Sequence, residues 1–351
     1  MGASAATPAA PLLERDGDLE ALAAARRDAS TGHGRFVIVE GRAGMGKTAL
    51  LAATRMAALE EGFDVLTARA SELERQYAFG VVRQLFEGRV RRAPGWLDDA
   101  AASARPAFDP AGAGGHAGFD GGPLTVLHGL YWLTVNACAD TPVMLVTDDV
   151  QWCDQASLRF LAYVGRRLEG MSLVIVAGLR RSEPLWEEPL VAEMARQPGG
   201  VVIEPAPLSE AAVAQLLEVR LGARPHAGFT AACHRATGGN PLLLDELARA
   251  MHADGVRPDI ASPDVVADLG PRAVSQTVLL RLARLDDDAV ALARAVAVLG
   301  EGGDLAVLSA MTGLPAAAIE TAGRALIRAE ILRPEPPLGF VHPLIRDDSS
   351  W

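Results

Sequence analysis

The stretch that most constrains this chain is Gly41-Arg42-Ala43-Gly44-Met45-Gly46-Lys47-Thr48, which fits the phosphate-binding loop pattern G-x-x-x-x-G-K-[ST] at every fixed position. A short apolar run over residues 36–40 precedes it, and a strong helix former over residues 49–58 follows it. Strand, glycine loop and helix in this order predict backbone N–H groups that curl around phosphate oxygens at a helix N-terminus. Lys47 then reaches the β- and γ-phosphates of a nucleotide, and the Thr48 hydroxyl ligates Mg²⁺. The predicted nucleotide-binding residues of this loop are Gly41, Gly44, Met45, Gly46, Lys47, Thr48 and Ala49.

Lysine usage supports this interpretation, because Lys47 is the only lysine among 351 residues. The chain takes arginine wherever a generic positive charge suffices. The wide, planar guanidinium does not replace a compact ammonium inside a phosphate cradle. A chance glycine-rich turn with one lysine is the structural alternative, and the spacing, the flanks and the lysine usage together favour the phosphate loop.

Composition sets limits on the class of protein. Half of the residues are hydrophobic and 22% are charged, as in an ordinary globular protein, and 351 residues suffice for two or three domains. The net charge of −11 predicts no general attraction to nucleic acid or to an anionic membrane. The three widely spaced cysteines predict reduced thiols rather than a disulfide framework or a metal site. With no long apolar run and no basic leader, we expect a cytoplasmic protein without membrane contact.

Further apolar runs predict the rest of an α/β domain with a parallel sheet. Strands are expected over residues 63–69, 142–147, 172–179 and 201–204. Helices are expected over residues 19–30, 124–138 and 154–168 and after residue 80, and a long mobile loop over residues 93–122, where glycine and proline gather. Residues 1–11, rich in alanine and proline, are expected to be disordered.

A second chemical signal follows the run over residues 142–147, which ends in Asp148 and Asp149. A buried strand that ends in acid is where a P-loop enzyme holds Mg²⁺ and polarises water. Asp148 is the predicted Mg²⁺ ligand together with Thr48, and Asp149 is the candidate to orient the attacking water. The structural alternative is a strand that ends in an Asp-Asp turn. Arg180, at the end of the next strand, is either a sensor of the γ-phosphate or a solvated charge.

From residue 208 onward the pattern becomes purely helical. Asn240 and Pro241, in the run Thr237-Gly238-Gly239-Asn240-Pro241, make a good N-cap and first position for a helix. Helices are also expected over residues 287–299, 304–311 and 315–330. Residues 331–333 and 339–342 flank a proline turn like two strands of a wing, and we expect that final domain to be cut short.

These motifs together resemble the N-terminal ATPase region of large ATP-binding regulators of the LuxR type, within the STAND class of AAA/Orc-like signalling P-loop ATPases. The motifs that carry the resemblance are the loop 41–48, Ser71-Glu72-Leu73-Glu74 with Phe79-Gly80, Asp148-Asp149-Val150-Gln151-Trp152, Leu179-Arg180, Thr237-Gly238-Gly239-Asn240-Pro241 and Phe340-Val341-His342-Pro343-Leu344. The family's helical repeats and C-terminal helix-turn-helix have no counterpart here, so direct transcriptional regulation is not carried over.

The resemblance implies a P-loop NTPase sheet of the ASCE, AAA-like type, followed by an all-helical lid and a winged-helix-like domain. The expected boundaries are 12–208 for the ATPase domain, 209–262 for the lid and 263–351 for the winged helix. By the same resemblance Pro241 packs near the adenine and His342 lies near the ADP β-phosphate. From the residues alone, a lone histidine such as His342 is more often a structural edge residue than a ligand.

The expected function is an ATP/Mg²⁺-binding switch with weak ATPase activity, in which Lys47, Asp149 and Arg180 serve catalysis and ATP/ADP with Mg²⁺ are the cofactors. One alternative is a non-catalytic nucleotide-binding module that self-associates or heteromerises with related full-length ATPases. The other alternative binds DNA through the winged helix. Arg324 and Arg328 favour DNA binding, whereas Glu320 and the net charge of −11 oppose it, so we expect no specific nucleic-acid binding.

Overall fold

The structure is a computed structural model, and it describes residues 12–108, 122–180, 189–197, 199–266, 269, 278–279, 281–299, 304–329, 331–333 and 338–340. The chain forms two compact units. Met1–Gly41 and Lys47–Pro205 make up the first, and Arg42–Gly46 and Ala206–Trp351 make up the second. The predicted tail over residues 1–11 lies outside the described residues.

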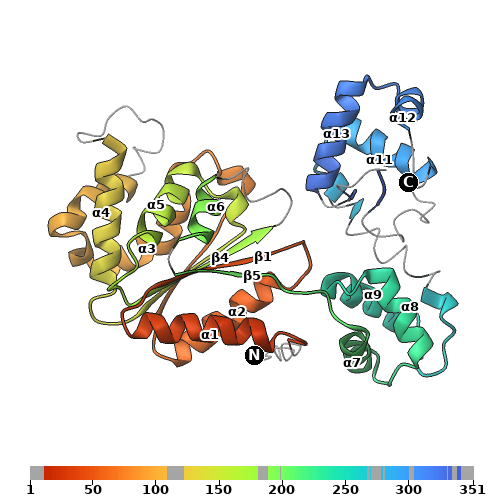
Figure 1. The fold of residues 1–351 in the computed structure, drawn as a ribbon, viewed down its shortest axis with the longest axis horizontal. Coiled ribbons are helices and arrows are strands. Elements are labelled where there is room, and N and C mark those ends of the chain that lie inside the picture. The colour runs from red at the N-terminus through yellow and green to blue at the C-terminus, as the bar shows by residue number, and fades with distance from the viewer. Residues whose placement is uncertain are drawn as a thin grey trace, which may run out of the picture. The chain divides into compact units, whose positions relative to one another are not determined.

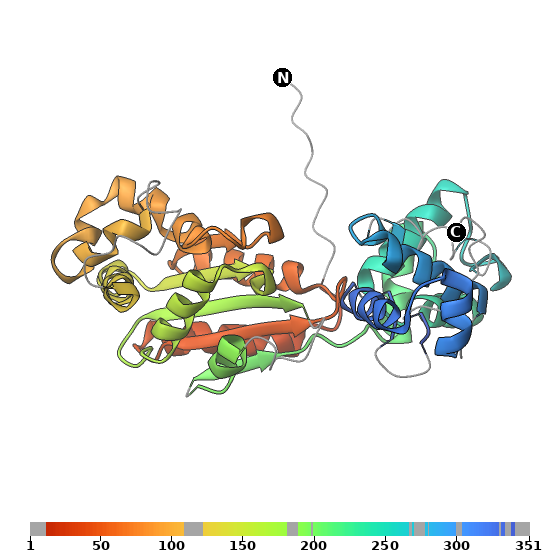
Figure 2. The same cartoon turned by 90° about the horizontal axis from the view of Figure 1, so that it is seen from above.

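The first unit is built on a parallel sheet, which confirms the predicted P-loop NTPase fold. Its strands are β1 (Arg35–Gly41), β2 (Asp64–Arg69), β3 (Val143–Asp148), β4 (Leu173–Arg180) and β5 (Gly200–Ile203), in the order β2-β3-β4-β1-β5. All neighbouring pairs are parallel, and the strand arrows point the same way in Figure 2. The register sets Gly41 beside Arg180 and Arg69 beside Asp148. The carboxyl ends of the strands therefore bring the predicted site residues to one edge of the sheet.

Helices cover both faces of this sheet (Figure 1). The helices α1 (Asp16–Ser30) and α2 (Lys47–Glu60) pack on one face, against strand residues such as Val37 and Val146. The other face carries α3 (Gly80–Arg92), α4 (Gly122–Ala137), α5 (Gln155–Gly165) and α6 (Pro189–Ala195). Phe36 and Ile38 point into that second core. Strands buried on both faces read as continuous apolar runs, which is why the sequence predicts them well.

Asp154 joins α5 to the start of α3. Its Oδ1 accepts hydrogen bonds from the backbone N–H groups of Ser157, at 2.9 Å, and Phe79, at 2.8 Å. It is buried, and as the N-cap of α5 it satisfies a helix terminus. Asp154 therefore ties the end of the segment that follows β2, which includes the short helix η1 (Glu72–Glu74), to α5 on the same face of the sheet. The sequence predicts Asp154 only as the start of a helix.

The predicted loop over residues 93–122 is more regular than expected. Its first part forms two 3₁₀ helices, η2 (Pro94–Leu97) and η3 (Asp99–Phe108). Ala101, Ala104 and Ala107 are buried at a spacing of three residues, which is the repeat of a 3₁₀ helix. A Cβ added at Gly129 of α4 would lie 2.4 Å from the backbone nitrogen of Ala104. Close packing on α4, which local composition does not reveal, thus orders this segment.

The described part of the second unit consists mostly of helices. These are α7 (Glu210–Leu221), α8 (Ala227–Thr237), α9 (Pro241–Ala253), α11 (Asp287–Leu299), α12 (Leu305–Thr312) and α13 (Ala316–Arg328). Side-chain caps begin α7 at Ser209, α9 at Asn240 and α12 at Asp304, close to the predicted starts. Among the described helices none alone has the length and apolar character of a membrane span, although the sharply bent pair α12 and α13 meets that test when taken together.

A single antiparallel bridge between Leu332 and Phe340 is what the described residues show of the predicted wing. The backbone N–H of Arg333 donates to the carbonyl oxygen of Gly339 at 2.7 Å. The boundaries of the lid and the winged-helix domain remain predictions.

Cys138, Cys153 and Cys233 form no disulfide with one another, and Cys153 and Cys233 are buried. Burial raises the pKa of the Cys138 and Cys233 thiols to about 12. Both are therefore protonated and unreactive at neutral pH.

Candidate nucleotide-binding site

The glycine loop follows β1 directly, and its backbone requires glycine. Gly44 and Gly46 have φ angles of +82° and +91°, which side chains disfavour. Lys47 opens α2, so the loop ends on the N–H groups of a helix N-terminus. This is the strand, loop and helix order that the sequence predicts, and such a helix N-terminus is where an anion binds.

The side chain of Lys47 is turned into its own loop. It is only 7% exposed, and its Nζ donates to the carbonyl oxygen of Gly41 at 2.6 Å. Gly41 is the last residue of β1, six positions earlier in the chain. An ammonium held by the carbonyl at the start of the loop lies within the curve that the loop makes, which is where a phosphate-binding lysine is needed.

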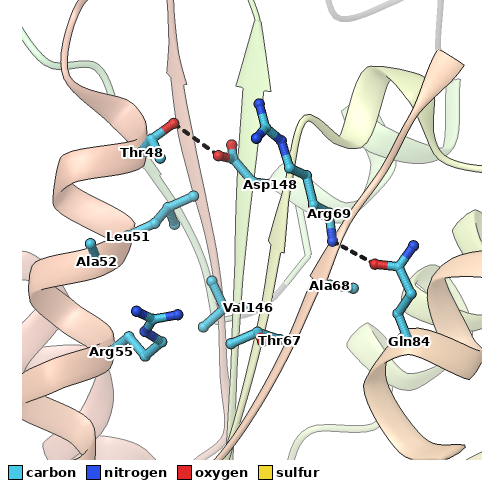
Figure 3. Close-up of a pocket in the computed structure, with 10 residues that line it drawn as sticks. All are labelled: Thr48, Leu51, Ala52, Arg55, Thr67, Ala68, Arg69, Gln84, Val146 and Asp148. Atoms are coloured by element: carbon cyan, nitrogen blue, oxygen red, sulfur yellow. Dashed lines mark hydrogen bonds between the residues drawn. The ribbon is translucent and has the colours of Figure 1, made fainter. Parts of the chain in front are cut away.

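Thr48 and Asp148 meet across one hundred residues of sequence. The Thr48 hydroxyl donates to Oδ2 of Asp148 at 2.8 Å, and Oδ1 of Asp148 accepts from the backbone N–H of Asp149 at 2.9 Å. Figure 3 shows this contact between the first turn of α2 and the end of β3. The predicted metal-binding pair is therefore brought together by the fold.

Gly178 makes room for that pair, a role that was not predicted from the sequence. A Cβ added there would lie 2.5 Å from Oδ1 of Asp148 and 2.9 Å from Cδ1 of Leu51. Gly178 sits near the end of β4, a strand that is otherwise buried and apolar. A glycine inside such a strand is itself a sign of a close approach by another group.

Asp149 is held by three donors on neighbouring elements. Its Oδ1 accepts from Nε of Arg180 and from Nε2 of Gln151, both at 3.0 Å, while a guanidinium nitrogen of Arg69 lies 3.5 Å from Oδ2. Its φ of +55° is left-handed, and its side chain is 9% exposed. Arg180, a predicted site residue, thus joins Asp149 directly.

Gln151 and Arg69 belong to this cluster although the sequence analysis gave them no role. Gln151 lies in the short helix η5 (Val150–Trp152), and its Oε1 accepts from the backbone N–H of Arg180 at 3.1 Å. It therefore bonds both members of the Asp149–Arg180 pair. The sequence feature that could have indicated this role is the position of Gln151 inside the motif Asp148-Asp149-Val150-Gln151-Trp152.

Asn240 contacts the glycine loop within the second compact unit, to which Arg42–Gly46 belong. Its Oδ1 caps α9 by accepting from the backbone N–H of Leu242 at 3.0 Å, and its Nδ2 donates to the carbonyl oxygen of Ala43 at 2.9 Å. The capping role was predicted and is confirmed, whereas the bond to Ala43 was not foreseen. A Cβ added at Gly44 would lie 2.4 Å from Oδ1 of Asn240.

The predicted ligand roles of Pro241 and His342 stay predictions. Pro241 occupies the first position of α9, as its sequence context predicts, and its contact with adenine stays a prediction. His342 lies outside the described residues, so its contact with the ADP phosphate likewise stays a prediction.

The donor set at Thr48 and Asp148 suits Mg²⁺, because both supply hard oxygen atoms. Within the described residues there is no cluster of three or more histidine, cysteine or acidic side chains that could hold a metal ion by itself. Mg²⁺ commonly takes one or two protein oxygens and completes its shell with phosphate and water. These residues therefore fit a Mg²⁺ that arrives with a nucleotide.

Comparison with known proteins agrees with this geometry. Residues 11–176 match the family described as AAA ATPase domain, a stretch that includes the loop, Asp148 and Asp149. This stretch is therefore similar to an AAA-type ATPase domain, in agreement with the P-loop NTPase fold of the first unit. No curated protein matches the sequence.

Several solved structures resemble the chain along most of its length. The ORC2 protein of Aeropyrum pernix, in ADPNP–ADP complexes, is 16% identical, with a TM-score of 0.52 over 96% of this chain and 92% of its own. A Walker-type ATPase of Pyrococcus abyssi is 11% identical, with a TM-score of 0.56 over 95% and 94%. The Aeropyrum pernix ORC1 protein in complex with DNA is 15% identical, with a TM-score of 0.50 over 91% and 84%. At such identities these likenesses establish the fold alone.

Proposed function

We propose that this protein is a signalling ATPase switch that binds ATP with Mg²⁺ and hydrolyses it slowly, of the STAND class and related to LuxR-type regulators. The observation that carries the proposal is the 2.8 Å contact between Thr48 and Asp148 beside the loop that holds Lys47. A hydroxyl and a carboxylate from the first turn of α2 and the end of β3 form the pair that P-loop ATPases use for Mg²⁺.

Each residue of the site has a specific role in this proposal. Lys47 leaves the Gly41 carbonyl and binds the β- and γ-phosphates, while the N-terminal N–H groups of α2 bind the phosphate oxygens. Thr48 and Asp148 hold Mg²⁺, which when bound neutralises charge on the phosphates. Asp149 orients the attacking water and takes its proton, and Arg180 stabilises the γ-phosphate.

The hydrogen bonds of Asp149 are the reason for expecting slow turnover. Its Oδ1 already accepts from both Arg180 and Gln151 at 3.0 Å. If Arg180 contacts the γ-phosphate, it has to leave Asp149, and the carboxylate then becomes available to water. Hydrolysis thus requires a rearrangement of the Asp149–Arg180 pair, and a conformational step of this kind commonly limits turnover.

The same contacts favour a second candidate, a nucleotide-binding module without turnover. If Asp149 and Arg180 stay paired, nucleotide serves structure or assembly, and the protein acts by self-association or by pairing with related ATPases. Both candidates share the loop and the Thr48–Asp148 pair, so they differ only in hydrolysis.

Identifying the nucleotide that co-purifies with the protein tests what the two candidates share. We expect close to one ATP or ADP per chain after extraction and chromatography, and Mg²⁺-dependent phosphate release above background. Absence of nucleotide, together with no ATP binding by isothermal titration, would overturn the proposal. Bound nucleotide without phosphate release would select the inert module. A difference in hydrogen exchange between the ATP and ADP states of the second unit would support a switch.

A further inference from the structure

A cavity of about 410 Å³ lies next to the Thr48–Asp148 pair, inside the first unit. It opens between α2 and β2, the strand at the edge of the sheet (Figure 3). Thr48 and Asp148 line one end, while Arg55 and Thr67 line the other. Leu51, Ala52 and Val146 supply an apolar floor. Ligand pockets commonly hold about 300–1,000 Å³, so the cavity has room for a small molecule.

Arg55 enters this cavity from α2 without a partner. Among the described residues it makes neither a hydrogen bond nor an ion pair, and its guanidinium points into the space between α2 and β2 in Figure 3. Leucine occupies the positions four residues before and after it, so no acid on the helix can pair with it. Some exposed helical arginines do have such a partner, for example Arg91 with Glu87.

Arg69 lines the opposite wall at the end of β2. Its side chain is 73% exposed, and its closest partner is Oδ2 of Asp149 at 3.5 Å, the outer limit of a hydrogen bond. Gln84 holds its backbone in place by accepting from the Arg69 N–H at 2.9 Å. The guanidinium of Arg69 therefore has donors left for another acceptor.

We propose that this cavity binds a small organic anion with an apolar body and a phosphate, sulfonate or carboxylate group. The anionic group lies at Arg55, because a guanidinium fork matches the geometry of such anions, and the other end of the ligand reaches toward Arg69 beside Asp148. The apolar body covers Leu51, Ala52 and Val146. This cavity adjoins the phosphate loop at Thr48, but binding at Arg55 does not depend on ATP hydrolysis.

Binding of a ligand in the cavity also affects Asp149 in the nucleotide site. A ligand that also reaches Arg69 competes with Asp149 for the Arg69 guanidinium. Removing that donor frees Oδ2 of Asp149, which changes the rate of phosphate release. This coupling rests on the proposed ATPase function, whereas binding in the cavity does not.

The test is a fluorescence titration of the full-length chain with 8-anilinonaphthalene-1-sulfonate, an aromatic sulfonate, with ADP and Mg²⁺ saturating the loop. We expect a saturable phase that Arg55→Gln weakens at least about tenfold and that Ala52→Trp removes by filling the cavity. Ala52 is exposed to solvent, so the larger side chain does not disturb the core. Arg92→Gln, at the exposed end of α3, is the matched control and should leave the titration unchanged.

Two readouts keep this inference separate from the proposed function. A titration that neither Arg55→Gln nor Ala52→Trp alters, in variants with a normal thermal melt, would refute the cavity site. Phosphate release is then measured with and without the sulfonate, in wild type and in Ala52→Trp. A change in wild type alone supports the coupling, and an unchanged wild-type rate refutes it. If the protein binds the sulfonate but releases no phosphate, the cavity site is supported and the proposed ATPase activity is refuted.

Discussion

Replacing Asp149 by asparagine separates hydrolysis from binding. The backbone there is left-handed, with φ of +55°, a conformation that asparagine adopts readily. The amide keeps the size of the carboxylate but cannot accept a proton from water. A general base contributes about 10²–10⁴ in rate, which corresponds to about 3–5 kcal/mol of activation free energy. We therefore expect Asp149→Asn to lower turnover at least about 100-fold.

The structure predicts a small effect of this variant on stability. Asp149 loses its ion pair with Arg180, but the Arg180 side chain is 41% exposed and water screens its charge. Such partly exposed pairs are worth about 1 kcal/mol or less. The melting temperature should fall by only about 2–4 °C. The affinity for ATP should stay within about threefold, because Lys47, Thr48 and Asp148 are untouched.

The assay is single-turnover phosphate release with excess enzyme, next to isothermal titration of ATP and a thermal melt. Asp140→Asn, at an exposed position, removes the same charge elsewhere and should change none of the three. If the variant is folded, binds ATP and releases phosphate within about threefold of the wild-type rate, Asp149 does not activate the water.

Three further variants and one binding assay test other parts of the site and fold. Lys47→Ala should remove most ATP affinity in isothermal titration at an almost unchanged melting temperature, because its ammonium faces the loop and not the core; normal binding would refute the loop assignment. Gly178→Ala should weaken Mg²⁺-dependent nucleotide binding at least about tenfold, because its Cβ would lie 2.5 Å from Asp148, and an unchanged Mg²⁺ titration would contradict this. The hydrogen bond from Arg26 is the main reason why the pKa of Glu61 lies below its ordinary value of 4.5. This stabilisation is present above pH 4.5 and lost as pH falls through the lowered pKa, so Glu61→Gln should lower the melting temperature slightly at pH 7 and match wild type in acid. DNA retention on a filter at physiological salt should be absent or nonspecific, since a protein with a net charge of −11 lacks the counterion release that drives such binding, and tight, sequence-selective retention would contradict this prediction.

Local patterns suffice for much of the fold. Five apolar runs predict the five strands. The reason is clearest for β1, β3 and β4, which are buried along almost their whole length and therefore need apolar side chains at nearly every position. Helix starts such as the one at Asn240 are predicted by capping chemistry within a few residues. The 3₁₀ helix over Asp99–Phe108 is missed, because its order comes from packing on α4 and not from its own composition.

The residues of the candidate site also fall into those that local sequence predicts and those that only the packing of separate segments brings together. The sequence by itself determined the glycine loop, the single lysine and the acids after β3, since each is a contiguous motif whose chemistry follows from residue type and spacing. Only the tertiary structure decided that Thr48 meets Asp148, that Gly178 leaves space for that contact, and that Asp149 is bonded to Arg180 and Gln151. The cavity beside Arg55 and Arg69 belongs to the same category. Strand order and register set these distances, and they depend on how separate segments pack, which no local stretch of sequence contains.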